Sequence, residues 1–338
     1  MDWRLWEVIM MPDVRLDEIF EQGRDSGRGN LLGIQPWMLP GDYAGEATFF
    51  ARLAGYFAAA AERGWLGPRT VVVLPEYLGT WLVVAGEAPA VYSARTTPAA
   101  IRRLALRHPA RMILAMLRST ARDRATDAVF QVKAAAMARI YQAVFSRLAR
   151  QYGVTIVAGS ILLPTPTVRD GQVTPNKGPL YNTSFIFHPD GQVDPRPVRK
   201  IYPDADELSF VAPGRVEDLP VWETPAGRLG VLVCADSWYP APYDRLRAQG
   251  VTLLAVPSAA SQGETWEAPW RGYSGWPAPA DVDLRDFSHL TERQAWEKYA
   301  MAGRIAASGA AAGINVFLYG DLWDLDFSGG QWRLAQGQ

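Results

Sequence analysis

The chain has 338 residues, of which 49% are hydrophobic and 20% are charged, so it can bury the core of one large domain or two ordinary ones. The 34 basic and 35 acidic residues leave a net charge of -1, which gives no indication of a nucleic-acid partner, and the single cysteine excludes an intrachain disulfide. The start of the chain lacks the pattern of a signal peptide, and no apolar run is long enough to cross a membrane. We therefore expect a cytoplasmic protein without a membrane span.

Short apolar runs alternate with helical patterns along the chain. We expect strands at 31–37, 70–76, 154–162, 181–188, 191–199, 229–234, 251–258 and 314–320, and helices at 46–64, 130–153, 241–249 and 290–312. The letters HPDG at 188–191 predict a hairpin turn, and Gly153 predicts the end of a helix. This alternation is typical of an α/β protein with buried strands. Without repeats or low-complexity linkers, we expect one domain at 30–338 after an N-terminal extension at 1–29.

An arginine-rich segment interrupts the alternation at about 91–125. Between Arg95 and Arg124 it holds eight arginines and a single acidic residue, Asp123. The letters PARMILAMLRSTARDR within it predict a basic amphipathic helix, inserted into the domain. Three interpretations stay open: a solvated helix over the core, a lid or oligomer contact, and a helix on a membrane surface.

A second irregular segment, 265–279, contains three tryptophans, a tyrosine and three prolines. This composition predicts a long loop, and long loops in compact domains are often functional. Its aromatic residues, Trp270 among them, fit either a structural cover or the wall of a substrate pocket.

Cys234 directly follows the predicted strand at 229–233, at a junction with a helix. In open α/β sheets, ligands bind at the carboxyl ends of strands, and a nearby helix N-terminus favours the thiolate form of cysteine. A cysteine nucleophile needs a base, yet none of the three histidines follows a buried strand. A cysteine–histidine pair and a metal site are therefore both disfavoured.

Two other strand ends carry the residue types that a cysteine nucleophile needs. Glu76 ends the apolar run VVVLPE, where partial desolvation raises the pKa of a carboxyl and suits it to proton transfer. Lys200 follows the run RPVR and supplies a cation. If the three strands end at one edge, Glu76, Lys200 and Cys234 assemble a base, a cation and a nucleophile.

These three residues, in this order and with these flanks, resemble the Glu-Lys-Cys triad of the nitrilase, or carbon-nitrogen hydrolase, superfamily. The matching stretches are LPEY, RKIYP and GVLVCAD, and YNTSFIFHPDGQV resembles the paired strands that precede the lysine. The resemblance implies an αββα sandwich with the triad between its layers and no cofactor or metal. It also implies a second glutamate, Glu207, seven residues beyond Lys200. Ala235, Tyr77, Trp238 and Trp270 are the residues that we expect around the substrate.

The resemblance implies hydrolysis of a non-peptide C–N bond, amide or carbamoyl, through a cysteine thioester with release of ammonia. Nitrile-cleaving members carry Trp-Glu directly after the cysteine, whereas this chain carries Ala235-Asp236, which favours an amide substrate. We expect Asp236 to bond backbone groups near the cysteine. Nitrile hydrolysis, acyl transfer to an amine and a non-catalytic binding role stay open as alternatives. The partners that we expect are a small amide-type substrate and a second copy of the chain, in a homodimer or higher homo-oligomer.

Overall fold

Two stacked β-sheets form the centre of the protein in a computed structural model, which describes residues 14–23, 27–260, 266–328 and 335–336. The first sheet has the order β1-β3-β4-β9, and the second has the order β11-β12-β13-β14-β17. The strands of the first are β1 (Asn30–Gly33), β3 (Thr70–Val73), β4 (Thr155–Val157) and β9 (Ile186–Phe187). Those of the second are β11 (Val221–Thr224), β12 (Gly227–Val231), β13 (Leu253–Ser258), β14 (Ala312–Phe317) and β17 (Ala335–Gln336). In the first sheet β1, β3 and β4 are parallel, and in the second sheet β12, β13 and β14 are parallel.

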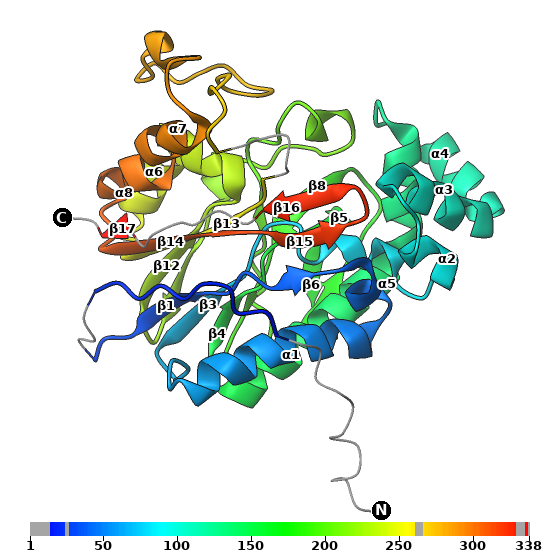
Figure 1. The fold of residues 1–338 in the computed structure, drawn as a ribbon, viewed down its shortest axis with the longest axis horizontal. Coiled ribbons are helices and arrows are strands. Elements are labelled where there is room, and N and C mark those ends of the chain that lie inside the picture. The colour runs from blue at the N-terminus through cyan, green and yellow to red at the C-terminus, as the bar shows by residue number, and fades with distance from the viewer. Residues whose placement is uncertain (1–13, 24–26, 261–265, 329–334, 337–338) are drawn as a thin grey trace, which may run out of the picture.

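Helices cover the outer face of each sheet, so the layers run α, β, β, α (Figure 1). α1 (Glu46–Glu62) and α5 (Arg124–Tyr152) lie on the first sheet, and α6 (Pro240–Ala248), α7 (Glu292–Tyr299) and α8 (Met301–Ser308) lie on the side of the second. The alternation along β3 shows this layering, because Val72 packs in the core with α1 and α5 while Val71 and Val73 pack with the second sheet. The predicted αββα sandwich is confirmed.

Several predicted strands are divided between two sheets. The run 154–162 forms β4 and then β5 (Ile161–Pro164), and 181–188 forms β8 (Leu180–Ser184) and then β9. The run 314–320 likewise becomes β14 and β15 (Tyr319–Leu322), and 31–37 becomes β1 and β2 (Trp37–Met38). The prediction of single strands was wrong here because the apolar pattern continues where the chain changes sheet, and in the runs 154–162 and 181–188 both halves are largely buried.

The smaller sheets lie beside the main pair. Their remaining strands are β10 (Val198–Arg199), which pairs with β8, β16 (Leu325–Ser328), which pairs with β15, and the hairpin of β6 (Thr167–Arg169) and β7 (Gln172–Thr174). The predicted strand at 191–199 is reduced to β10, since Pro195 and Pro197 lack the N–H that a ladder needs. The turn before it is confirmed, because the Gly191 N–H donates to the His188 carbonyl at 2.7 Å.

Helix ends differ from the predicted ones where a cap or a break decides them. α5 begins six residues early, because the Asp123 carboxylate accepts hydrogen bonds from the N–H groups of Ala125 and Thr126. It ends as predicted at Gly153, with a φ of 63°. The predicted helix at 290–312 is broken at Ala300, whose extended ψ of -155° separates α7 from α8.

The arginine-rich segment is helical, as predicted, but it is divided into short helices. They are α2 (Pro89–Tyr92), α3 (Thr97–Arg107) and α4 (Pro109–Arg118), which stand at one end of the molecule (Figure 1). Short 3-10 turns complete the regular structure at Pro40–Tyr43, Thr80–Val84, Glu207–Ser209, Val216–Asp218, Cys234–Trp238 and Leu284–Asp286.

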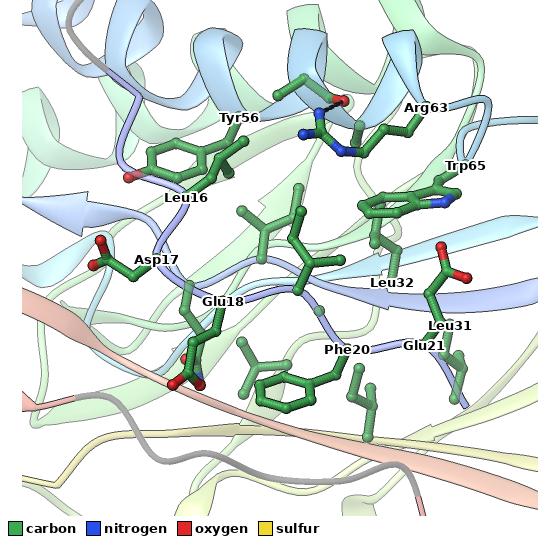
Figure 2. Close-up of a pocket in the computed structure, with 18 of the residues that line it drawn as sticks. Leu16, Asp17, Glu18, Phe20, Glu21, Leu31, Leu32, Tyr56, Arg63 and Trp65 are labelled. Atoms are coloured by element: carbon green, nitrogen blue, oxygen red, sulfur yellow. Dashed lines mark hydrogen bonds between the residues drawn. The ribbon is translucent and has the colours of Figure 1, made fainter.

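The described part of the N-terminal extension, 14–23, lies along the first sheet and helix α1 (Figure 2). The Tyr319 hydroxyl donates to the Asp17 carboxylate at 2.8 Å, and Arg15 covers the ring of Trp37 at 4.4 Å. Between this segment, β1 and β14 lies a cavity of about 490 Å³. None of Glu76, Lys200 and Cys234 lines it, so this cavity is separate from the predicted triad. The boundary at residue 29 stays a prediction.

A glycine between β4 and β5 sets the position of the loop that carries Glu76. Gly159 has a φ of 65°, and a Cβ there would lie 2.1 Å from the carbonyl oxygen of Pro75. Any larger residue therefore meets both an unfavourable backbone conformation and the backbone of this loop.

We predict that Gly159→Ala lowers the free energy of unfolding by about 2–4 kcal/mol, because backbone strain and overpacking add. Gly309→Ala is the matched control, since Gly309 has a φ of 76° but nothing within 4 Å of its Cβ position. The control should lose only the backbone part, about 1–2 kcal/mol. Urea unfolding measures both, and equal losses would contradict the close approach to Pro75.

Candidate active site

Glu76, Lys200 and Cys234 come together in the interior, where strands from different sheets end. Glu76 follows β3, Lys200 follows β10, and Cys234 follows β12. Backbone hydrogen bonds fix two of them, because the Glu76 N–H donates to the Ser258 carbonyl at 3.2 Å and the Lys200 N–H donates to the Asn182 carbonyl at 2.8 Å. All three side chains are buried, and Glu76 and Lys200 are each only 1% exposed.

Glu207 belongs to the same cluster, in which one ammonium group contacts two carboxylates. The Lys200 Nζ donates to Glu76 Oε1 at 2.9 Å and to Glu207 Oε2 at 2.6 Å. Glu207 is only 4% exposed, so it is not a solvated loop carboxylate. Removing Lys200 would leave two buried carboxylates without a cation, and removing a glutamate would leave the ammonium with one carboxylate fewer. The three groups therefore form a single electrostatic unit.

The two carboxyl groups have opposite pKa shifts. Burial raises the pKa of Glu76 to about 7, and the charge of Glu207 adds to this rise while Lys200 opposes it. Burial also favours the neutral form of Glu207, but the ion pair with Lys200 and further hydrogen bonds outweigh it and lower the pKa of that group. The two acids therefore differ in role: Glu207 stays ionised, and Glu76 can accept and release a proton near neutral pH.

The backbone at Cys234 is in the left-handed region, with a φ of 49°. Tyr77, directly after Glu76, is in the same region with a φ of 61°. Such conformations cost about 1–3 kcal/mol in residues other than glycine and gather at functional sites. The Cys234 Sγ lies 3.8 Å from the Ala259 carbonyl oxygen, and its thiol also interacts with the Glu76 carboxyl.

The environment of Cys234 favours the neutral thiol, contrary to the expectation from a nearby helix N-terminus. Burial raises the pKa of this thiol well above its usual range, the charge of Glu76 adds to the rise, and Lys200 opposes it. The helix that follows, α6, begins only at Pro240, beyond a 3-10 turn. The thiol thus needs a base to become a nucleophile.

Asp236 bonds backbone groups around the cysteine, as predicted. Its carboxylate accepts from the N–H groups of Ile201 and Tyr202 at 2.8 Å each and from that of Val233 at 3.1 Å. This buried side chain ties the segment after Lys200 to the segment before Cys234. It therefore sets the relative position of Lys200 and Cys234.

Asn182 is a member of the cluster that the sequence did not reveal. Its Nδ2 donates to Glu76 Oε1 at 2.9 Å and to Glu207 Oε1 at 3.0 Å, and the side chain is fully buried. Tyr77, expected near the substrate, donates its hydroxyl hydrogen bond to the same Glu207 oxygen. Lys200 and Asn182 both donate to Oε1 of Glu76, and the Cys234 thiol interacts with the same carboxyl group. An asparagine inside an apolar strand was the one available signal.

The expected aromatic residues lie near this site but deep in the core. Trp238 stacks on Trp270 with ring centroids 5.7 Å apart, and Trp270, 2% exposed, also stacks on Tyr299 at 5.4 Å. Trp276 of the same loop reaches the segment before Glu207, donating its Nε1–H to the Pro203 carbonyl at 2.7 Å. Thr265, the first residue of the predicted loop, lies outside the described residues. A substrate-contacting role for Trp238 and Trp270 stays a prediction.

Ala235, expected near the substrate, follows Cys234 in the 3-10 turn at Cys234–Trp238. Within the described ranges of the chain, no hydrogen-bond acceptor is assigned to its N–H.

The described ranges contain no gathering of three or more histidine, cysteine, aspartate or glutamate side chains suited to a metal ion. Nor do they contain a helix long and apolar enough to cross a bilayer.

Residues 40–275 match the sequence profile of the family described as "Carbon-nitrogen hydrolase", and the chain therefore belongs to this family. It is 33% identical over 132 residues to a deaminated glutathione amidase from Yersinia enterocolitica, which covers 36% of this chain and 42% of that protein. It is also 33% identical over 89 residues to nitrilase 2 from Arabidopsis thaliana, 26% of each chain. The chain thus matches less than half the length of these two relatives.

Solved structures similar to this chain include an amidase from Nesterenkonia sp., with a TM-score of 0.48 and 14% identity over 89% of this chain and 80% of that one. A carbon-nitrogen hydrolase from Helicobacter pylori G27 has a TM-score of 0.49 and 17% identity, covering 88% of this chain and 79% of that one.

The pKa of Cys234 gives a prediction that needs no substrate. Iodoacetamide should modify the folded protein at this one cysteine, slowly at neutral pH and faster as the pH rises past the usual range of a thiol. Lys200→Met should shift the midpoint to still higher pH, because Lys200 lowers the pKa of the thiol. Mass spectrometry of the modified protein measures the rates, with unfolded protein as the control. Equal rates for folded and unfolded protein at neutral pH would contradict the raised pKa.

Proposed function

We propose that this protein hydrolyses the C–N bond of a small carboxylic amide or carbamoyl compound through a thioester on Cys234. The observation that carries the proposal is the buried cluster of Glu76, Lys200 and Glu207 beside the thiol. It holds a proton acceptor with a pKa near 7, a fixed cation and a nucleophile, which are the groups that acyl transfer requires.

The first half-reaction forms the thioester. The Glu76 carboxylate takes the proton of the Cys234 thiol, and the sulfur bonds to the carbonyl carbon while the C=O electron pair moves onto oxygen. The Lys200 ammonium and the Ala235 N–H stabilise this oxyanion. As the oxyanion collapses, the C–N bond breaks, and Glu76 returns its proton to the nitrogen so that ammonia leaves.

The second half-reaction removes the acyl group. A water molecule gives a proton to Glu76 as its oxygen bonds to the thioester carbon, and the same two donors stabilise the second oxyanion. Its collapse breaks the C–S bond, and the sulfur recovers a proton from Glu76. Glu207 supports both halves, because its fixed negative charge keeps Lys200 protonated and helps to raise the pKa of Glu76.

An amide substrate is favoured over a nitrile by the residues after the nucleophile, Ala235-Asp236, which differ from the Trp-Glu pair of nitrile-cleaving members. The relatives include both an amidase and nitrilases, so they are compatible with either substrate. Ammonia release across a panel of amides, carbamoyl compounds and nitriles separates these classes. An amine acceptor that replaces water in the products would instead indicate acyl transfer.

We predict that Cys234→Ala lowers ammonia release by about 10⁴-fold or more, since no other thiol replaces the covalent nucleophile. Circular dichroism should show an unchanged fold, because the substitution removes one sulfur atom. Near-normal turnover in this variant would refute the thioester mechanism.

Lys200→Met should lower kcat by about 10²–10³-fold with a smaller effect on KM, because the charge that lysine stabilises develops only along the reaction path. Steady-state kinetics at several pH values measure the two constants separately. An effect confined to KM would make Lys200 a substrate-binding residue instead.

Glu207→Gln should slow turnover by about 10²-fold and let the thioester accumulate, because in this proposal Glu207 also orders the water molecule that gives its proton to Glu76 in deacylation. The acylated protein would appear in an intact-mass spectrum of acid-quenched reactions as a mass increase that is absent from Cys234→Ala. Wild-type kinetics in Glu207→Gln would remove this residue from the mechanism.

A further inference from the structure

The outer face of helix α4 is apolar, which is the reverse of the usual pattern for a helix on a protein surface. Ala110, Ile113, Leu114 and Leu117 share one face, at the spacing i, i+3, i+4 and i+7. All four are exposed, and Ile113 and Leu117 are 60% and 75% exposed. The opposite side packs against α5 through the buried Met112.

Exposed apolar side chains are concentrated in the helix pair α3–α4, residues 97–118. Leu106 of α3 is 72% exposed and Met116 of α4 is 38% exposed. With Ile113, Leu114 and Leu117, these make up five of the ten large exposed hydrophobic side chains in the described part of the chain. The pair stands at the end of the molecule away from α6, α7 and α8 (Figure 1). A gathering of this kind marks an interaction surface.

The helix pair is also strongly basic. Residues 97–118 hold five arginines and no acidic residue, and the carboxylate of the acidic residue that follows, Asp123, caps α5. The buried acid Glu87 is paired with Lys133 at 2.6 Å, with His108 at 2.9 Å and, in the helix pair, with Arg107 at 3.6 Å. Arg102, Arg118 and Arg122 have no ion-pair partner among the described residues. The outer surface of the pair therefore carries uncompensated positive charge.

We propose that the helix pair α3–α4 docks the protein onto an anionic lipid surface. Leucine and isoleucine side chains would enter the boundary between headgroups and acyl chains, and arginines beside them would contact the lipid phosphates with their stems along apolar surface. A second copy of the chain fits this face less well, since a two-fold contact would place arginines against arginines. This proposal rests on the surface alone and not on the proposed hydrolysis.

The test is co-sedimentation of the full chain with phosphatidylcholine vesicles, with and without phosphatidylglycerol. The expected result is binding only to the vesicles that contain phosphatidylglycerol, weakened by added salt. Ile113→Gln/Leu117→Gln should weaken this binding about tenfold or more, because two apolar side chains no longer leave water. Arg102→Gln/Arg118→Gln should weaken it about fivefold for each arginine.

The matched control is Leu284→Gln, because Leu284 is 66% exposed but lies outside the helix pair. It should bind as the wild type does, and thermal unfolding should show that every variant folds. Absence of vesicle binding by the wild-type protein would overturn the proposal, as would binding that Ile113→Gln/Leu117→Gln leaves unchanged. Analytical sedimentation without lipid tests whether the face instead binds a second copy of the chain. If the wild-type protein is a dimer and Ile113→Gln/Leu117→Gln dissociates it, the lipid proposal is overturned.

Discussion

The ion pair between the Lys200 ammonium and two buried glutamates is the interaction on which the site depends. Two buried carboxylates on one ammonium group repel each other, and without the lysine one of them would be protonated at neutral pH. With the lysine 2.9 Å from Glu76 and 2.6 Å from Glu207, one carboxyl stays charged while the other titrates near 7. The cost of burying these charges is offset by their mutual contacts and by the hydrogen bonds of Asn182 and Tyr77.

The sandwich places these groups by bringing strand ends from both sheets to one point. Glu76 leaves the first sheet and hydrogen-bonds to β13 of the second, and Cys234 leaves β12 beside it. Asp236 then ties the cysteine turn to the backbone after Lys200. Because each contact joins segments distant in sequence, the geometry of the site is set by packing of the whole domain rather than by any one loop.

Local patterns of apolar runs and polar endings predicted an α/β protein and the residues at the three strand ends, whereas the layer order was implied by the resemblance to the nitrilase superfamily. The sequence did not predict where β4 gives way to β5 or β8 to β9, because an apolar run stays apolar when both sheets are buried. Asn182 was missed for a related reason: its partners, Glu76 and Glu207, are 106 and 25 residues away. The aromatic composition of 265–279 likewise did not reveal that Trp270 faces the core.

The pKa of Cys234 shows the same limit, since a helix N-terminus can be predicted from sequence whereas complete burial beside Glu76 cannot. The raised pKa of the thiol and the pKa of Glu76 near 7 together define the account: a neutral nucleophile activated by a buried carboxylate. Burial also raises the pKa of Asp236 to about 7, so an ionisation observed near pH 7 could belong to either Glu76 or Asp236.

The pH dependence of kcat/KM for amide hydrolysis tests this account most directly, because this constant reports the ionisation of the free enzyme. The base must be ionised to act, so kcat/KM should fall as the pH drops below about 7. In Glu207→Gln the fall should move to lower pH, because Glu207 raises the pKa of Glu76 but is not among the main causes of the shift of Asp236. A fall at the usual pKa of a glutamate, or one that Glu207→Gln does not move, would contradict the assignment of Glu76 as the buried base.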